Sequence, residues 1–276
     1  MASPPPDREP VHIDMTVAHT ARVYDYLLGG TDNFAIDREV AAHAFATYPG
    51  GGVDAARADA RANRDFLRRA VRYLVHEAGL RQFLDIGTGI PNADNTHAVA
   101  REEASDSRVV YVDNDPIVLA HAHSILRDPE STSYIHGDFR DPEAILADAE
   151  ATLDFTSPVA VVLTGLLHVI PDSDDPYGCV RALLAAVPPG SYLALSHLTT
   201  DIAVGAMATV TSRLDETMHT TNPPAFRSLA EVTRFFAGLD LVDPGVVPAQ
   251  AWRPECGKVT ESTRESPLYA GVGRKP

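Results

Sequence analysis

The residues with the clearest chemical meaning lie between Asp85 and Gly89, where an apolar run ends in an acid and two glycines follow. Gly87 and Gly89 allow the backbone to turn sharply around Thr88 and leave space for a ligand beside the main chain. A helix that starts after such a turn points its free N–H groups at that ligand. Cofactors bind at this position in open α/β sheets, so we expect Asp85, Gly87, Thr88 and Gly89 to contact one.

The turn also favours one class of cofactor. A dinucleotide site has a third glycine three residues after the second, but this chain has Asn92 there. The carboxylate of Asp85 suits a ligand amine better than a pyrophosphate, because a pyrophosphate carries charge of the same sign. An amine-bearing nucleoside cofactor therefore fits the sequence better than NAD.

Three acids fall at the C-terminal ends of successive predicted strands, namely Asp85, Asp113 and Asp138. Asp113 follows the glycine turn at roughly the 20-residue interval at which a carboxylate receives ribose hydroxyls. An ionised carboxylate only accepts hydrogen bonds, so it suits a diol, and Asp138 suits the exocyclic amine of a base. Asn114 and Asp115 are alternatives beside Asp113, although Asp115 is better explained as the cap of a helix that starts after it.

The elements that position these residues follow from the alternation of apolar runs and helical patterns. Alternating strands and helices predict an α/β fold, here Rossmann-like and doubly wound, with a mostly parallel seven-stranded sheet. The last two strands are expected to be an antiparallel pair. Helices over 16–28, 37–47 and 54–78 precede the first strand and predict an N-terminal helical cap. The expected strands are 82–86, 109–113, 133–138, 159–163, 191–196, 239–247 and 268–272, and the expected units are a flexible tail over 1–12, the cap over 13–80 and the cofactor-binding core over 81–276.

Several of these segments resemble one known group of enzymes. Residues 84–89 (LDIGTG), 109–113 (VVYVD) and 137–141 (GDFRD) with the apolar fourth strand resemble class I S-adenosylmethionine-dependent methyltransferases. Residues 21–34 (ARVYDYLLGGTDNF) and 90–92 (IPN) more narrowly resemble the actinobacterial "SAM-dependent methyltransferase" family, formerly a domain of unknown function. Pro91 departs from the broader pattern, which has a glycine there. The resemblance implies S-adenosylmethionine as cofactor, with its methionine at residues 85–89, its ribose at Asp113 and its adenine at Asp138 and Phe139.

The cap motif has a physical interpretation of its own. A helix that is broken by Gly29-Gly30 and followed by a polar turn can fold over a site as a lid. Arg22 then pairs with the carboxylate of the cofactor and Asn33 bonds its amine or carboxylate, while aromatic side chains exclude water. The sequence leaves open the alternative that the tyrosines are core residues and Arg22 pairs with an acid. The cap residues expected at the cofactor are Arg22, Tyr26, Gly30 and Asn33, with Tyr24, Asn63 and Arg64 as further candidates.

Two histidines follow strands whose ends face the predicted site. Methyl transfer from a sulfonium needs no acid for the leaving group, so catalysis consists mostly of aligning the acceptor with the methyl group and excluding water. A general base is needed only if the acceptor keeps its proton. His168 and His197 follow the fourth and fifth strands, and each suits a base with a pKa near neutrality or a hydrogen-bonded structural role. Thr164, at the end of the fourth strand, completes the predicted cofactor site. It begins Thr-Gly-Leu-Leu, where amino-directed DNA methylation would need an Asn/Asp-Pro-Pro-aromatic segment.

Bulk composition narrows the partners. A net charge of −15 disfavours nucleic acid, because a phosphate backbone needs a basic stripe. Two cysteines in 276 residues indicate a reducing cytoplasm, and no apolar run is long enough for a membrane span. No metal-ligand spacing is present. We expect a methyltransferase for a small-molecule acceptor, with a catalytically silent S-adenosylmethionine-binding regulator and an NAD-dependent oxidoreductase as alternatives, and a homodimer is left open.

Overall fold

The structure is a computed structural model that describes residues 15–91, 95–125, 131–218, 224–254 and 266–276, so the predicted tail over 1–12 lies outside the described residues. The strands are β1 (Gln82–Ile86), β2 (Arg108–Asp113), β3 (Thr132–His136), β4 (Ala160–Thr164), β5 (Tyr192–Leu198), β6 (Asp240–Leu241), β7 (Val247–Pro248) and β8 (Leu268–Arg274). The α-helices are α1 (Thr20–Leu28), α2 (Ala35–Ala44), α3 (Val53–His76), α4 (Thr96–Glu103), α5 (Pro116–Ile125), α6 (Pro142–Ala149), α7 (Pro176–Ala186), α8 (Val204–Met218) and α9 (Leu229–Arg234). Short 3-10 turns are η1 (Leu167–Val169), η2 (Asp172–Asp174) and η3 (Ala249–Ala251).

The described strands form one sheet in the order β3-β2-β1-β4-β5-β8-β6, with β7 also paired to β8. β1 to β5 are parallel and β8 is antiparallel to β5, so the mostly parallel α/β fold is confirmed. The sheet has eight strands rather than the predicted seven. The segment predicted as one strand over 239–247 is two short strands, β6 and β7, because a turn closed by Gly245 N–H and Val242 O at 2.8 Å interrupts the ladder.

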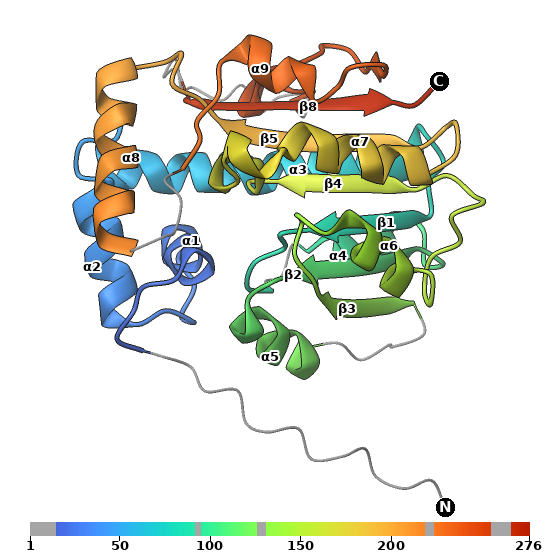
Figure 1. Ribbon diagram of the computed structural model, residues 1–276, viewed down its shortest axis with the longest axis horizontal. Coiled ribbons are helices and arrows are strands. Elements are labelled where there is room, and N and C mark those ends of the chain that lie inside the picture. The colour runs from blue at the N-terminus through green and yellow to red at the C-terminus, as the bar shows by residue number, and fades with distance from the viewer. Residues whose placement is uncertain (1–14, 92–94, 126–130, 219–223, 255–265) are drawn as a thin grey trace, which may run out of the picture.

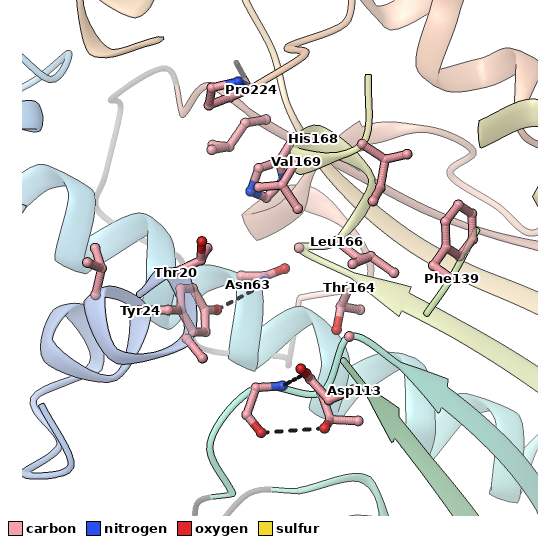
Figure 2. A pocket seen from close by; sticks show the side chains of 18 of the residues that line it. Thr20, Tyr24, Asn63, Asp113, Phe139, Thr164, Leu166, His168, Val169 and Pro224 are labelled. Atoms are coloured by element: carbon pink, nitrogen blue, oxygen red, sulfur yellow. Dashed lines mark hydrogen bonds between the residues drawn. The ribbon is translucent and has the colours of Figure 1, made fainter. Parts of the chain in front are cut away.

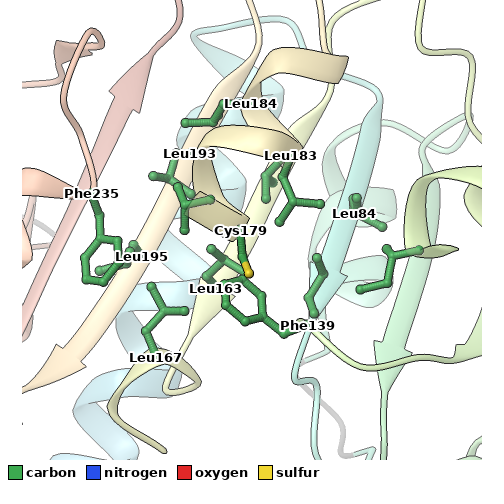
Figure 3. Packing of buried hydrophobic residues seen from close by; sticks show 14 of the residues in the cluster. Leu84, Phe139, Leu163, Leu167, Cys179, Leu183, Leu184, Leu193, Leu195 and Phe235 are labelled. Carbon is green, nitrogen blue, oxygen red and sulfur yellow. The ribbon is translucent and has the colours of Figure 1, made fainter. Parts of the chain in front are cut away.

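Helices cover both faces of this sheet (Figure 1). α6 and α7 pack on one face through a core that includes Leu84, Leu163 and Leu183, shown in Figure 3. α3 and α4 pack on the other face, where Phe66 and Val109 belong to a second core. The central strands are therefore buried on both sides, which is why they read as continuous apolar runs rather than alternating ones.

The cap consists of α1, α2 and the first half of α3, and α8 packs against them although it lies more than a hundred residues further along the chain (Figure 1). Val23, Val40, Ala56 and Val210 belong to this third cluster, one from each of the four helices. The second half of α3 packs on the sheet instead. One continuous helix of 24 residues thus connects the cap to the sheet.

Glycine and proline mark several helix boundaries, and α5, α6 and α7 each begin at a proline. α1 ends at Gly29, whose φ of 85° is in the left-handed region that glycine adopts at lowest cost. α3 has the predicted apolar stripe at spacings of three and four, and it ends two residues before the predicted end. α1 starts at Thr20 rather than at residue 16, and α9 ends at Arg234 rather than near 238, so the errors are in boundaries.

Candidate active site

One cavity, with a volume of about 430 Å³, opens at the carboxyl ends of β1, β2 and β4 and extends under the cap (Figure 2). The strand order reverses between β1 and β4, and this is where an open α/β sheet leaves a crevice. The structure brings ten of the predicted site residues to its wall. They are Asp85, Gly87, Thr88, Gly89, Asp113, Asn114, Asp138, Phe139, Thr164 and His168.

The glycine turn needs both of its glycines. Gly87 has a φ of 75° and Gly89 a φ of 64°, values that other residues adopt only with strain. A Cβ on Gly87 would lie 2.7 Å from Leu166 Cδ1, so the turn also passes too close to the segment after β4 for a side chain. Gly87 N–H donates to Val112 O at 2.8 Å, which anchors the turn to β2.

Asp113 is held in place by main-chain donors. Gly89 N–H donates to its Oδ2 at 2.9 Å and Asp115 N–H donates to its Oδ1 at 2.9 Å. Burial raises the pKa of the Asp113 carboxyl, and these two hydrogen bonds oppose that shift. Each carboxylate oxygen keeps a further lone pair for a ligand hydroxyl.

Asp85 is a buried acid whose ionisation state changes with pH close to neutrality. Its Oδ2 accepts a hydrogen bond from Thr96 Oγ1 at 2.6 Å. Burial raises the pKa of Asp85 to about 6, while Thr96 and the guanidinium of Arg64 act to lower it and Asp113 adds to the rise. A carboxyl with this pKa is mostly ionised at neutral pH and becomes neutral in mild acid.

Asp138 lies at the end of β3 beside Arg140. Arg140 Nε donates to Asp138 Oδ1 at 2.8 Å, and Asn114 Nδ2 donates to Asp138 Oδ2 at 3.3 Å. The hydrogen bond from Arg140 is the main cause that lowers the pKa of Asp138 to about 2. The neighbouring Phe139 is buried in the hydrophobic core on one face of the sheet (Figure 3) and also lines the cavity.

The predicted lid residues are placed differently from the expectation, because four of them are absent from the cavity wall. Arg22 is 1% exposed, its Nε lies 2.9 Å from Asp37 Oδ2, and its guanidinium covers the ring of Phe34 at 5.0 Å. Tyr26 lies under the guanidinium of Arg57 at 4.7 Å. The alternative reading of Arg22, a partner for an acid, is the correct one, and we assign it to the internal structure of the cap.

Asn33 and Gly30 shape the loop after α1. Asn33 Nδ2 donates to Gly30 O at 2.9 Å and to Asp25 Oδ2 at 2.8 Å, and its Oδ1 accepts from Arg38 at 2.8 Å. A Cβ on Gly30 would lie 2.0 Å from Asp25 Oδ1, so the glycine is required by this close approach. These contacts assign both residues to the loop rather than to the cavity.

Another set of cap residues reaches the cavity. Tyr24 and Asn63 lie side by side on its wall (Figure 2), and Asn63 Nδ2 donates to the Tyr24 hydroxyl at 2.9 Å. Asn63 Oδ1 accepts from Ser196 Oγ at 2.6 Å, and Ser196 Oγ accepts from Gly165 N–H at 2.9 Å. This chain of hydrogen bonds joins α1 and α3 of the cap to the ends of β4 and β5. Burial raises the pKa of Tyr24, which keeps its phenol neutral.

Only one of the two predicted histidines lines the cavity. His168, on η1, lines the cavity, and its Nδ1 is buried without a hydrogen-bond partner. His197 lies behind it at a ring-centroid distance of 5.9 Å, away from the cavity wall, with Nδ1 2.6 Å from Leu198 O and Nε2 2.9 Å from Arg227 Nη1. Burial lowers the pKa of His168 to about 4 and that of His197 well below its usual range. The prediction of pKa values near neutrality is therefore wrong, because it did not include burial beside Arg227.

The sequence argument missed several residues on the wall. His19 and Thr20 start α1 beside Asp115, and His19 Nδ1 lies 2.8 Å from Asp115 Oδ2. Leu166 and Phe226 come from loops that no periodic pattern marks. Only the position of Leu166 after β4, at a strand end that faces the site, was a usable signal.

Within the described residues, no helix combines the length and apolar character that a membrane span requires. No group of three or more histidine, cysteine or acidic side chains in those residues is arranged to hold a metal ion.

Comparison with known proteins decides the family. A family model described as S-adenosyl methyltransferase matches residues 6–276. The chain belongs to this family. A crystal structure of a DUF574 family protein from Streptomyces avermitilis is 41% identical, with a TM-score of 0.89 over 96% of this chain and 100% of that chain. A putative methyltransferase from Thermobifida fusca is 39% identical, with a TM-score of 0.85 over 95% of this chain and 96% of that chain.

More distant comparisons add only the fold. The structure of TnmH has a TM-score of 0.51 at 19% identity and covers 81% of this chain and 57% of that chain. None of the curated proteins that were compared matches this chain. The protein is thus an S-adenosylmethionine-dependent methyltransferase, and S-adenosylmethionine is its cofactor.

Proposed function

We propose that this methyltransferase acts on a small-molecule acceptor, with the cofactor on the strand-end carboxylates and the acceptor under the cap. The observation that carries the proposal is one cavity whose wall includes the strand-end acids Asp85 and Asp113 together with Tyr24 of the cap and His168. The volume of about 430 Å³ suits small ligands rather than a folded polymer. Bound S-adenosylmethionine supplies a methyl group that is activated by the positive charge of its sulfonium.

Asp113 fits the ribose of the cofactor. Its two oxygens are oriented by hydrogen bonds from Gly89 and Asp115 before any ligand binds. Binding therefore costs little side-chain conformational entropy at Asp113. A diol presents two O–H donors to these oxygens, and hydrogen bonds to a charged acceptor are about twice as strong as neutral ones. Gly89 has open space where a Cβ would be, which leaves the main chain accessible beside the ribose.

Asp85 and Arg64 fit the two charges of the methionine portion. Asp85 carries a carboxylate at the start of the glycine turn, and Arg64 lines the same part of the cavity from α3. Arg64 Nη2 donates to Asn95 Oδ1 at 3.2 Å, which directs the guanidinium toward the turn. We assign to Arg64 the carboxylate contact that the sequence suggested for Arg22.

His168 is the residue placed to contact the acceptor. Its imidazole lines the cavity and is neutral at physiological pH because its pKa is about 4, so the ring adds no charge to the wall that meets the acceptor. The residues around the site orient the acceptor and exclude water, which is the main requirement of an in-line displacement.

The proposal is tested by a binding and transfer experiment. We expect S-adenosylhomocysteine to bind in calorimetry and NAD not to bind under the same conditions. With isotope-labelled S-adenosylmethionine, label should pass to components of a small-molecule library and not to mixed DNA, RNA or protein. Binding without transfer to any acceptor class would favour the catalytically silent regulator, and transfer to nucleic acid or protein would contradict the proposal.

Replacing Asp85 with asparagine should change binding and stability in opposite directions. The carboxyl has a pKa of about 6 in the folded chain and about 3.9 unfolded. Since the pKa is higher in the folded chain, the free energy of unfolding falls as the pH rises from about 4 to about 6, and it stays at the lower value above that range. At pH 7.5 we expect Asp85→Asn to raise the free energy of unfolding by about 1–2 kcal/mol, because asparagine removes the buried charge but remains polar. It should weaken S-adenosylhomocysteine binding about tenfold, because the ligand amine loses an ionic partner.

Calorimetry and urea unfolding over pH 5–8 check both effects. The affinity of the original chain should fall as the pH drops below about 6, while that of Asp85→Asn should stay flat. Asp54→Asn, at an exposed position on α3, is the control and should change neither quantity. Parallel pH profiles for Asp85→Asn and the original chain would contradict the assignment.

A further inference from the structure

We infer that His19, the residue before α1, is a positioning residue for the ribose site of the cofactor and that it couples docking of the cap to cofactor binding. The inference rests on the proposed function, in which Asp113 receives the ribose, and it adds a cap residue that acts on this acid through Asp115. His19 lines the cavity together with Asp113. α1 belongs to the cap, whereas Asp115 lies between β2 and α5 of the core (Figure 1).

His19 makes a short polar contact from the cap to the core. Its Nδ1 lies 2.8 Å from Asp115 Oδ2, and its side chain is 42% exposed whereas that of Asp115 is 2% exposed. A carboxylate oxygen only accepts hydrogen bonds, so this contact requires a proton on Nδ1. Ala21 N–H lies farther from Nδ1, at 3.4 Å, and adds little. The ring is therefore held mainly by Asp115 rather than by its own helix.

Asp115 depends on His19 because one of its carboxylate oxygens has no other donor. Oδ1 accepts from Ile117 N–H at 2.8 Å, which caps α5. Within the described residues, the buried Oδ2 has no hydrogen-bond partner apart from its contact with His19. Burial by itself would raise the pKa of Asp115, but its contacts with His19 and Ile117 lower it below its ordinary value. Asp115 is thus a buried charge, and loss of His19 would leave Oδ2 unpaired.

The contact reaches Asp113 through the backbone. Asp115 N–H donates to Asp113 Oδ1 at 2.9 Å, and Gly89 N–H donates to the other oxygen, Oδ2, at 2.9 Å. The Asp113 carboxylate thus has one donor from the glycine turn and one from the residue that His19 holds. A shift of Asp115 toward water would lengthen the second hydrogen bond and turn the lone pairs of Asp113 away from a diol.

The other side of the contact is fixed within the cap. His19 N–H donates to Asp37 Oδ1 at 3.0 Å, and Asp37 Oδ2 lies 2.9 Å from Arg22 Nε. The side chains of Asp37 and Arg22 are both buried, so His19 is attached to the interior of the cap. Movement of the cap would therefore carry His19 away from Asp115. Since linkage is reciprocal, a ligand that fixes Asp113 and Asp115 also favours the docked cap.

Two substitutions of His19 separate its contact with Asp115 from its place before a helix. Asparagine has a side-chain nitrogen at the position of Nδ1, so His19→Asn keeps the contact, whereas the serine side chain is one bond shorter and does not reach Asp115. Both residues are preferred before a helix, so α1 should start normally in either variant. His43→Ser, at an exposed position on α2, is the control for loss of a cap histidine.

The ribose hydroxyl groups provide the readout. Dissociation constants of adenosine and 2′,3′-dideoxyadenosine are measured by ligand-observed NMR, and their ratio reports the hydrogen bonds of the diol. We expect the original chain to bind adenosine at least about tenfold more tightly than dideoxyadenosine. This preference should fall at least about threefold in His19→Ser and stay within about twofold of the original in His19→Asn and His43→Ser.

Two results of this measurement would overturn the inference. A merely structural role for His19 would weaken both nucleosides equally and leave the preference for adenosine unchanged in His19→Ser. Equal losses of preference in His19→Asn and His19→Ser would mean that the imidazole contacts the ligand directly, because only the outer part of the ring is missing from His19→Asn.

A double variant tests whether His19 acts through Asp115. Asp115→Ser keeps one oxygen to cap α5 and has none for His19. In the Asp115→Ser background, we expect His19→Ser to change the preference for adenosine by less than about 1.5-fold, because the oxygen that it would leave unpaired is gone. A loss of the same size in both backgrounds would show that His19 does not act through Asp115.

Hydrogen exchange tests the coupling to the cap. Saturating S-adenosylhomocysteine should slow the exchange of α1 amides in the original chain and in His19→Asn, by a factor at least about threefold larger than in His19→Ser. Equal protection of α1 in all three chains, or none in the original chain, would contradict the coupling.

The outcomes separate this inference from the proposed function. If S-adenosylhomocysteine does not bind the original chain, or if the original chain binds adenosine and dideoxyadenosine equally, the ribose site at Asp113 is wrong and the inference falls with it. If the preference for adenosine is lost in Asp113→Ala but unchanged in His19→Ser, the ribose site stands and the role of His19 is wrong.

Discussion

Replacing Asp113 with alanine is expected to weaken the binding of S-adenosylhomocysteine about 100-fold or more. The carboxylate accepts from Gly89 and Asp115 at 2.9 Å each, and these contacts aim its remaining lone pairs into the cavity. Two hydrogen bonds from a ribose diol to a charged acceptor contribute about 1.5–3 kcal/mol each, and about 1.4 kcal/mol is a tenfold change in affinity. Calorimetry measures the loss.

Two controls for Asp113→Ala test whether the loss of affinity comes from the lost charge or from a change in the stability of the fold. Asp113→Asn keeps one oxygen and the shape of the side chain, so we expect an intermediate loss of about tenfold. Burial raises the pKa of Asp113, so removal of the charge relieves a cost and the free energy of unfolding should change by less than about 1 kcal/mol. Equal affinities for Asp113→Ala and the original chain, with both folded, would rule out this ribose site.

Arg227→Met is expected to cause the largest loss of stability, about 3–5 kcal/mol. The guanidinium is buried and donates to Leu167 O at 2.7 Å and to Ile170 O at 2.9 Å, and its Nη1 lies 2.9 Å from His197 Nε2. Nη2 also bonds Asp172 Oδ1 at 2.7 Å. Methionine fills the space but leaves the buried carbonyl oxygens without donors, and each such group costs about 1–3 kcal/mol.

Urea unfolding measures this loss, and a neighbouring arginine provides the control. Arg227 and Arg234 both lie over the ring of Tyr177, at 5.8 and 4.2 Å, but Arg234 is exposed. Arg234→Met should therefore cost less than about 1 kcal/mol. Similar losses in the two variants would show that the ring contact, and not the buried hydrogen bonds of Arg227, carries the stabilisation.

Most of the fold was predictable because local pattern and burial agree. β4 is short, apolar and buried, and its sequence alone predicted a central parallel strand. The error at β6 and β7 has a different origin. The segment over 239–247 has suitable residues for a strand, but the turn between Val242 and Gly245 decides where pairing with β8 stops.

The candidate site was predictable at the strand ends and not in the cap. The carboxyl ends of parallel strands lie at one edge of the sheet. Once the strands were assigned, Asp85, Asp113 and Asp138 were therefore expected near the same cavity. A helix presents side chains all around its axis, and its sequence does not say which neighbour each face meets. Arg22 and Tyr24 are two residues apart on α1, yet Arg22 faces Asp37 and Tyr24 faces the cavity.

By itself, the order of residues determined the α/β class, the glycine turn and the acids that edge the cavity, because each depends on local backbone geometry and short spacings. Only the tertiary structure decided that α8 packs against the cap, that Arg64 rather than Arg22 lines the cavity with Asp85, and that His168 rather than His197 reaches the cavity. These choices depend on packing between segments far apart in the chain. Burial, which sets the pKa of His168, exists only once those segments are together.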